Sequence, residues 1–230
     1  LFQNILFEVS DSIATLTLNR PDRLNSFTAA MHLDIRNALG QVRANSSVRV
    51  LLLTGAGRGF CAGQDLNERS TAPNDAPPDL GLSIEKNYNP LVMNLRSLQL
   101  PVIAAVNGVA AGAGANLALA CDIVIAARSA TFIQAFCKFG LVPDCGGSYF
   151  LTRQLGAARA MGLALFGDKL SAEQAAQWGL IWKCVEDAEL HSTARALAKQ
   201  LATGPTLGYA RTKQAIYAAQ TSGLAQQQIG

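Results

Sequence analysis

The stretch that decides the fold is PVIAAVNGVAAGAGANLALACD, at positions 101–122. Residues 102–106 are all apolar, which is typical of a strand buried on both faces of a sheet. A tight turn and the small residues at 110–115 follow, and the Ala- and Leu-rich segment after them predicts a helix through Ala120. Small residues let a ligand lie against the backbone, and a helix N-terminus offers unpaired N–H groups with partial positive charge. The stretch therefore predicts a site that stabilises developing negative charge.

Length and composition limit the alternatives. The chain has 230 residues, 50% of them hydrophobic, which is enough for one large domain or one domain with an appendage. Only 15% of residues are charged, a hint that some surface is buried against other subunits. The formal net charge of +3 is small and dispersed, so we predict no nucleic-acid partner.

Apolar runs, chain ends and cysteines bear on the compartment and processing of the protein. No apolar run reaches the length of a membrane span and no signal peptide opens the chain, so we predict no membrane partner. The chain starts at Leu1 rather than Met and ends abruptly at Gly230, which suggests a trimmed fragment. The five cysteines form no Cys-x-x-Cys pair, which predicts reduced thiols in a cytoplasmic protein.

Along the chain, strands and helices alternate. We predict a hairpin over 5–9 and 13–18, a helix after its cap Thr28, and a buried strand over 48–53. Proline-rich residues 70–78 are expected to form a mobile loop. The later predicted elements are a helix over 83–98, a strand over 123–127, helices over 145–155 and 157–165 that meet at Gly156, a helix over 171–178, a strand over 180–185, and helices over 187–202 and 206–219. This alternation predicts a layered α/β fold.

Several chemistries can be set aside. Glycines at 55–59 follow a strand, but their spacing does not fit a dinucleotide-binding loop, and no phosphate-binding P-loop exists. His32 and His191 lie on predicted helices far from any motif, so we interpret them as surface or helix-face residues. No His- or Cys-rich cluster occurs, and we predict no metal site. Cys61 and Cys145 are interpreted as small packed residues rather than nucleophiles.

Two backbone elbows and one carboxylate remain. The elbows are CAGQD at 61–65 and GAG at 112–114. The carboxylate is Asp144, which lies in the apolar run GLVPDCGG at 140–147. Asp144 fits two interpretations, the N-cap of a helix and a catalytic carboxylate, and the two are compatible.

These residues also carry a family resemblance. The segments NRP at 19–21, LN at 24–25, TG at 54–55, GFCAGQDL at 59–66, AVNG at 105–108, AG at 111–112, CD at 121–122 and GG at 146–147 resemble the crotonase (enoyl-CoA hydratase/isomerase) superfamily, in order along nearly the whole chain. The resemblance implies a crotonase-type spiral of ββα units with the CoA site in residues 1–186, and a C-terminal helical region in 187–230 that supports trimerisation. It also implies an acyl-CoA substrate, with CoA as part of the substrate and no further cofactor. The implied assembly is a homotrimer or a dimer of trimers. The resemblance also allows this assembly to associate with a hydratase paralogue.

The resemblance also assigns site residues. The backbone N–H groups of Gln64 and Ala113 would form the oxyanion hole for the thioester oxygen. The remaining positions expected to contact substrate are Arg23, Leu24, Ala62, Leu66, Gly112, Asn116 and Phe136. Of these, Arg23 and Leu24 would edge the CoA groove, whereas Ala62, Gln64 and Leu66 would offer backbone to the adenine end.

The position of the carboxylate indicates the reaction. Hydratases of the superfamily carry glutamates at the positions of Asn116 and Phe136, so hydration is disfavoured here. Asp144 matches the aspartate of dienoyl-CoA isomerases and of ring-handling members, and several segments are very similar to members that convert 1,2-epoxyphenylacetyl-CoA to 2-oxepin-2(3H)-ylideneacetyl-CoA in phenylacetate catabolism. We therefore expect an isomerase in which Asp144 moves a proton while the oxyanion hole stabilises an enolate. A carboxylate buried among apolar walls should have a raised pKa.

Other functions stay open at this point. A double-bond isomerase for enoyl- or dienoyl-CoA, an aryl-CoA dehalogenase and an enoyl-CoA hydratase would use the same scaffold. A dehalogenase would also need a histidine near the site, and neither histidine fits. From a different class, a non-catalytic CoA-binding partner subunit would share the fold.

Overall fold

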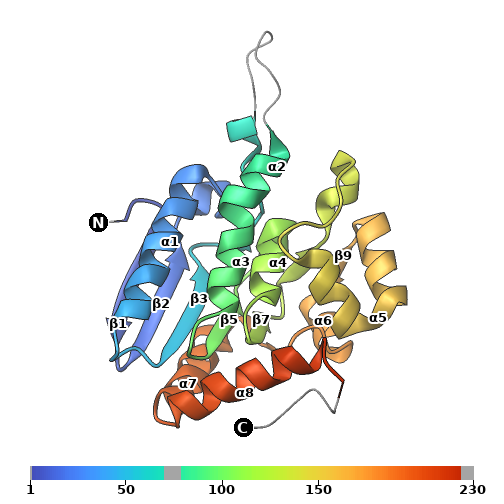
Figure 1. Cartoon of the computed structure of the whole chain (residues 1–230). Helices are drawn as coiled ribbons and strands as arrows, with labels where there is room; N and C mark the ends of the chain where they lie inside the picture. Colours follow the sequence, from blue (N-terminus) through green and yellow to red (C-terminus); the bar gives the residue numbers. More distant parts are fainter. Residues whose placement is uncertain (1, 70–78, 224–230) are drawn as a thin grey trace.

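A computed structural model describes residues 2–69 and 79–223 of the chain (Figure 1). The predicted loop at 70–78 lies outside the described residues. Strands from successive parts of the chain build two sheets, and helices cover them (Figure 1).

The larger sheet has six strands in the order β1-β2-β3-β5-β7-β10. Its strands are β1 (Ile5–Ser10), β2 (Ile13–Leu18), β3 (Val50–Gly55), β5 (Val102–Val106), β7 (Ile123–Ala127) and β10 (Lys183–Val185). β1 and β2 pair antiparallel, and the other pairs are parallel. Asp11 and Ser12 join β1 to β2 with φ of 53° and 61°, as in a type I′ turn. The predicted hairpin is confirmed, and so is the buried strand at 102–106.

The smaller sheet has four short strands in the order β4-β6-β8-β9. They are β4 (Gly59–Cys61), β6 (Val109–Ala111), β8 (Thr131–Ile133) and β9 (Lys169–Ser171). β4, β6 and β8 are parallel, whereas β9 is antiparallel to β8. The chain repeatedly places one strand in the larger sheet, the next strand in the smaller sheet, and then a helix. This repeat is the predicted spiral of ββα units.

The helices begin and end close to the predicted positions. They are α1 (Ala29–Ala44), α2 (Leu80–Ser83), α3 (Asn89–Arg96), α4 (Ala113–Leu119), α5 (Gly147–Phe166), α6 (Ala172–Gln177), α7 (Leu190–Ala202) and α8 (Thr206–Ala219). A π-helical segment, Ile84–Tyr88, joins α2 to α3, so the helix predicted from residue 83 starts earlier, at Leu80. Thr28 Oγ1 accepts a hydrogen bond from the Met31 N–H at 3.1 Å, which confirms the predicted cap. Gly156 has φ of 75° and ψ of 167° and divides α5, also as predicted.

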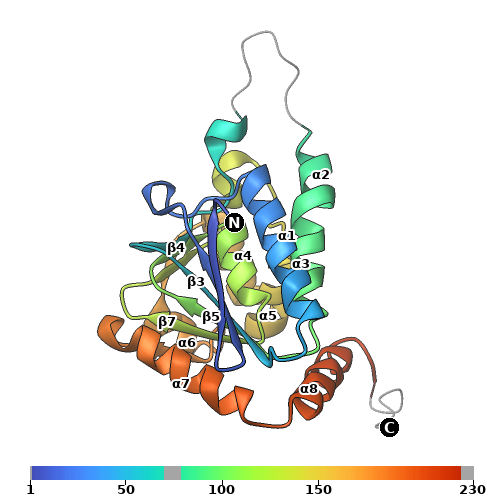
Figure 2. The same cartoon turned by 90° about the vertical axis from the view of Figure 1, so that its left-hand side faces the viewer.

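The C-terminal helices differ in how they join the core. α1 and α3 lie on one side of the larger sheet and α7 on the other (Figure 2). The face of α7 that meets the sheet is made of buried Leu190, Ala194, Ala198 and Ala202. These buried side chains make α7 part of the core rather than an appendage. α8 is instead attached by a buried ion pair of 2.8 Å between Lys213 Nζ and Asp122 Oδ2.

Candidate active site

The two elbows meet at one edge of the smaller sheet. β4, β6 and β8 are parallel neighbours, so their carboxyl ends lie at the same edge, where ligands bind in many α/β folds. A cavity of about 410 Å³ opens there. Its lining residues come from both elbows, from the segment before α5 and from the α2–α3 region: Ala62, Gly63, Gln64, Leu66, Leu80, Tyr88, Gly112, Ala113, Ala135, Phe136, Phe139, Leu141 and Asp144.

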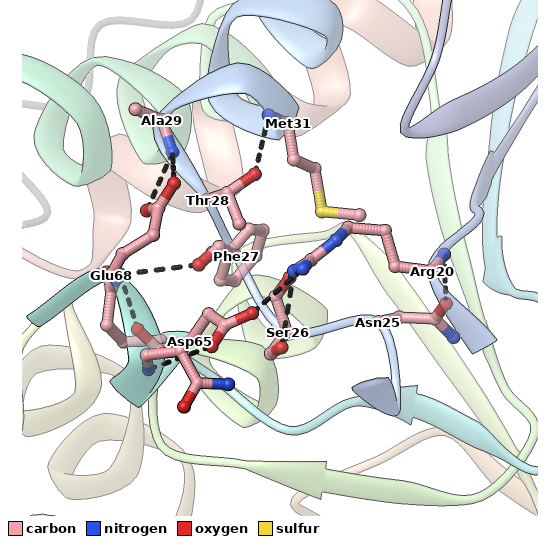
Figure 3. A network of polar contacts seen from close by, with 11 residues as sticks. Arg20, Asn25, Ser26, Phe27, Thr28, Ala29, Met31, Asp65 and Glu68 are labelled. Atoms are coloured by element: carbon pink, nitrogen blue, oxygen red, sulfur yellow. Dashed lines mark hydrogen bonds and ion pairs between the residues drawn. The ribbon is translucent and has the colours of Figure 1, made fainter. Parts of the chain in front are cut away.

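Polar contacts hold the first elbow, Cys61–Asp65, against the loop that precedes α1 (Figure 3). Arg20 Nη2 lies 2.8 Å from Asp65 Oδ2, and Arg20 Nη1 donates to the Ser26 carbonyl oxygen at 2.6 Å. Buried Asn25 donates to the carbonyl oxygens of Ala56 and Gly59 at 2.9 and 2.8 Å. Burial acts to raise the pKa of Asp65, but the hydrogen bond from Arg20 and smaller contributions outweigh it and hold this pKa below its usual value. Asp65 therefore stays ionised and keeps the elbow attached to the loop before α1.

The backbone pairing of this elbow directs the Gln64 N–H group. The Phe27 N–H donates to the Gly63 carbonyl at 2.7 Å, and the Asp65 N–H donates to the Phe27 carbonyl at 2.9 Å. Both bonds lie on the side of the strand that faces Phe27, so the N–H of Gln64, between them, points the other way. Gln64 lines the cavity.

The second elbow places its donor beside the first. Gly112 has φ of 52° and ψ of −124°, a backbone conformation that suits glycine, and its N–H donates to the Ile133 carbonyl at 2.8 Å. Ala113 is the first residue of α4, so its N–H has no acceptor within the helix. A Cβ on Gly63 would lie 2.8 Å from the Ala111 carbonyl oxygen and 3.5 Å from the Ala113 nitrogen. Gly63 thus lets the two elbows touch, and both predicted donors line one cavity.

Asp144 lines the same cavity on an irregular segment. The Gly147 N–H donates to the Asp144 carbonyl at 2.8 Å, which closes a turn through Cys145 and Gly146 with φ of 51° and 76°. α5 begins at Gly147, with Gly146 as its N-cap and no side-chain cap hydrogen bond. The interpretation of Asp144 as a helix N-cap is therefore wrong. The interpretation as a cavity carboxylate fits its place.

The rest of the lining is mainly apolar. Phe136 is buried and packs on Gly112, where a Cβ would lie 3.7 Å from the ring. Phe139 keeps 59% of its surface exposed at the cavity wall. Burial raises the pKa of Cys61 to about 12 and raises the pKa of Cys145 as well, so both thiols stay protonated. Both are buried, packed residues, as predicted.

Three predicted contact residues lie outside the cavity lining. Arg23 is exposed and Leu24 is half-buried on the loop beside the first elbow, where the Leu24 carbonyl accepts from the Ala62 N–H at 2.9 Å. Asn116 is fully buried behind the wall and has no exposed surface. The other seven predicted site residues do line the cavity: Gln64, Ala113, Asp144, Ala62, Leu66, Gly112 and Phe136.

The sequence did not reveal two aromatic residues near the site, Tyr88 and His32. Tyr88 lines the cavity, and its hydroxyl donates to Gln64 Oε1. His32 is buried on α1, stacked on Phe27 at 4.9 Å between ring centroids and edge-on to Tyr88 at 4.5 Å, so of its two predicted placements the helix face is correct and the surface is not. Burial, with a smaller effect of the Arg36 charge, lowers the pKa of His32 from 6.5 to about 4. The stacking positions come from distant segments, and no local motif marks them.

Residues 2–69 and 79–223 contain neither a cluster of metal ligands nor a helix that could span a membrane. Within this part of the chain no group of three or more His, Cys, Asp or Glu side chains could hold a metal ion. Nor does any described helix combine the length and apolar character needed to cross a membrane.

The fold and the paired elbows define a class of protein, and sequence comparison gives the same class. Residues 8–229 match the profile of the enoyl-CoA hydratase/isomerase family, and the chain belongs to that family. The chain is 59% identical to the 1,2-epoxyphenylacetyl-CoA isomerase of Escherichia coli K12, over 97% of this chain and 86% of that protein. It is 48% identical to a probable enoyl-CoA hydratase of Rhodobacter capsulatus, over 94% of this chain and 82% of the relative.

Solved structures agree on the fold. The crystal structure of a putative enoyl-CoA hydratase/isomerase from Mycobacterium abscessus superposes with a TM-score of 0.92 at 33% identity, covering 97% of this chain and 86% of that chain. The structure of a monofunctional enoyl-CoA isomerase from M. smegmatis superposes with a TM-score of 0.82 at 34% identity, covering 97% of each chain.

Proposed function

We propose that this protein is an acyl-CoA isomerase that converts 1,2-epoxyphenylacetyl-CoA to 2-oxepin-2(3H)-ylideneacetyl-CoA. The main observation behind the proposal is which carboxyl groups line the cavity. Among the described residues that line it, Asp144 is the one carboxylic acid, and it shares the space with the backbone of Gln64 and Ala113. The 59% identity to an isomerase of this specificity supports the choice of substrate.

The geometry suits enolate chemistry. In the proposed reaction the N–H groups of Gln64 and Ala113 donate hydrogen bonds to the thioester oxygen. Negative charge grows on this oxygen when the α-carbon loses a proton, and preorganised donors stabilise the transition state most where charge develops. The Asp144 carboxylate accepts the proton and returns it, so the step involves no net oxidation and no group transfer.

The apolar walls favour isomerisation over hydration. Activation of water by general acid and base needs two properly placed groups, and the described residues that line the cavity offer one carboxyl group. The side chains of Phe136, Phe139 and Leu141 would surround an aromatic acyl group and exclude water from the enolate. The same single carboxylate supports a second candidate function, migration of a double bond in an enoyl- or dienoyl-CoA.

A direct assay separates these possibilities. The protein is incubated with 1,2-epoxyphenylacetyl-CoA and, separately, with a linear 3-enoyl-CoA, and the products are analysed by mass and ultraviolet spectrum. The proposal expects a product of unchanged mass with a new spectrum from the epoxide. A product heavier by one water would contradict isomerisation, and tight binding of both compounds without turnover would instead indicate a non-catalytic CoA-binding subunit.

We also propose that the protein assembles as a homotrimer or a dimer of trimers in the bacterial cytoplasm. Exposed apolar side chains on α5 and α8 support an assembly: Met161, Leu165, Phe166, Leu207 and Ile216. The low content of charged residues supports it too. Light scattering at micromolar concentration should give three or six times the mass of the chain, and a stable monomer would contradict the assembly. Co-elution with a hydratase paralogue would extend the proposal to a mixed complex.

A further inference from the structure

Two buried amide side chains link the smaller sheet to the backbone of Asp144. Gln134 follows β8, and its Nε2 donates to Asn116 Oδ1 at 2.9 Å. Asn116 lies in α4, and its Nδ2 donates to the Asp144 carbonyl oxygen at 2.8 Å. The exposed fractions of Asn116 and Gln134 are 0% and 3%, so water does not compete for these bonds.

The turn that carries Asp144 needs outside support. Residues 140–146 form no helix or strand, and Cys145 has a φ of 51°, a backbone conformation that is unfavourable for a residue other than glycine. The Asp144 carbonyl receives one hydrogen bond from within the turn, from the Gly147 N–H, and one from outside it, from Asn116. The second bond ties the turn to α4, the helix whose first residue, Ala113, is the predicted oxyanion donor.

Gly147 makes room for this contact. A Cβ on Gly147 would overlap the Asn116 amide nitrogen and lie 2.9 Å from its Cγ. The φ of Gly147 is not positive, so the backbone itself would accept alanine. What excludes a side chain at this position is the close approach of the Asn116 amide.

We propose that Asn116, oriented by Gln134, is a positioning residue that holds Asp144 at a fixed place relative to the oxyanion donors. The inference rests on the proposed role of Asp144 in proton transfer. Asn116 and Gln134 do not line the cavity, so their contribution falls on the rate of the chemical step rather than on the affinity for acyl-CoA. Small displacements of a reacting group cost much in rate, about 10²-fold for 1 Å.

Two variants test the contact from its two sides. Asn116→Ala removes the amide, and Gly147→Ala displaces it while leaving it in the chain. Both should lower kcat by about 10- to 100-fold, with KM and the affinity for a non-reactive acyl-CoA changed by less than about twofold. If the amide served stability alone, Gly147→Ala would lower the unfolding midpoint and keep a normal kcat. A normal kcat in both folded variants overturns the inference.

A matched control and a reference variant complete the test. Asn107 also joins backbone segments with its side chain, donating to the Gly57 carbonyl at 2.9 Å, and it does not line the cavity. Asn107→Ala should lower stability and leave kcat within about twofold; an equal kcat loss there would overturn the special role of Asn116. Asp144→Asn is measured in the same assay. If it is inactive while Asn116→Ala is normal, only this inference fails, whereas turnover by Asp144→Asn refutes the proposed function itself.

Discussion

The two halves of the cavity are held by different means. The first elbow is fixed by backbone pairing with Phe27, by the 2.8 Å ion pair of Arg20 with Asp65, and by the buried amide of Asn25. The carbonyl of Asp144 accepts one hydrogen bond from within its turn, from the Gly147 N–H, and one from the Asn116 side chain in α4. The elbow is thus fixed by backbone pairing and buried polar groups, whereas a side chain from α4 ties the turn of Asp144 to the second elbow.

This difference matches the groups that each half presents. The proposed oxyanion donors are backbone N–H groups, so only the course of the chain can place them, and changes there should affect stability, affinity and rate together. Asp144 acts through its side chain, which can be altered while the chain keeps its course. Changes in the turn that carries Asp144 should therefore affect the rate alone.

The largest combined effect on rate, affinity and stability is expected for Gly114→Ala in the second elbow. A Cβ at this position would overlap the Cys61 carbonyl oxygen and lie 2.7 Å from Cys61 Cβ, which forces the elbows apart. We expect kcat to fall by about 10²- to 10³-fold and stability to fall by about 1–3 kcal/mol, with weaker acyl-CoA affinity. Turnover, calorimetry and urea unfolding measure the three effects. Gly40→Ala is the matched control, because nothing lies within 4 Å of a Cβ there. Normal turnover by the Gly114 variant would show that the elbows do not need their close contact.

The second prediction concerns acid sensitivity beneath the first elbow. His32 packs on Phe27 and Tyr88, and burial lowers its pKa from 6.5 to about 4. Between these values the unfolded chain binds a proton that the folded chain does not, so stability is full above about pH 6.5 and falls as the pH drops toward 4. The loss from this group amounts to about 3 kcal/mol at the lower limit.

Urea unfolding from pH 7 to pH 5 measures this effect. His32→Phe keeps a ring in the stack and has no titrating nitrogen, so its stability should change less over the same range. Equal pH dependence in the wild type and the variant would mean that other groups cause the acid sensitivity.

The smallest effect is expected for Tyr88→Phe. The variant keeps the ring in the cavity wall and removes the hydrogen bond from the hydroxyl to Gln64 Oε1. Water or substrate can replace a donor at the cavity surface, so kcat and KM should each change by less than about tenfold, which corresponds to about 1.4 kcal/mol. Steady-state kinetics measure both constants. A loss of 10²-fold or more would place the Tyr88 hydroxyl in the catalytic machinery.

Local sequence patterns predicted the elements that local physics determines. The apolar run of β5, the cap Thr28 and the break at Gly156 each act through neighbouring residues, and each is confirmed. The strands of the smaller sheet were not predicted, because three residues are too few to show a period of two. Pairing with neighbouring strands, which a single segment does not reveal, makes them strands.

The site shows the same limit. Both elbows and Asp144 could be found from glycine spacing, one isolated carboxylate and the family resemblance, and all line one cavity. Asn116 could not be placed from its position in the chain, since its burial depends on Gln134 and on the missing side chain of Gly147. His32 likewise looked exposed until Phe27 and Tyr88, from other segments, enclosed it.

The most direct test of the account is Asp144→Asn, measured for turnover of 1,2-epoxyphenylacetyl-CoA and for calorimetric affinity toward a non-reactive acyl-CoA. The amide keeps the shape of the side chain and cannot act as the acid–base group. We predict that turnover falls by about 10²- to 10⁴-fold while affinity and the unfolding midpoint stay near those of the wild type. Near-normal turnover would contradict the proton-transfer role, and a joint loss of affinity and stability would show that Asp144 is a structural residue.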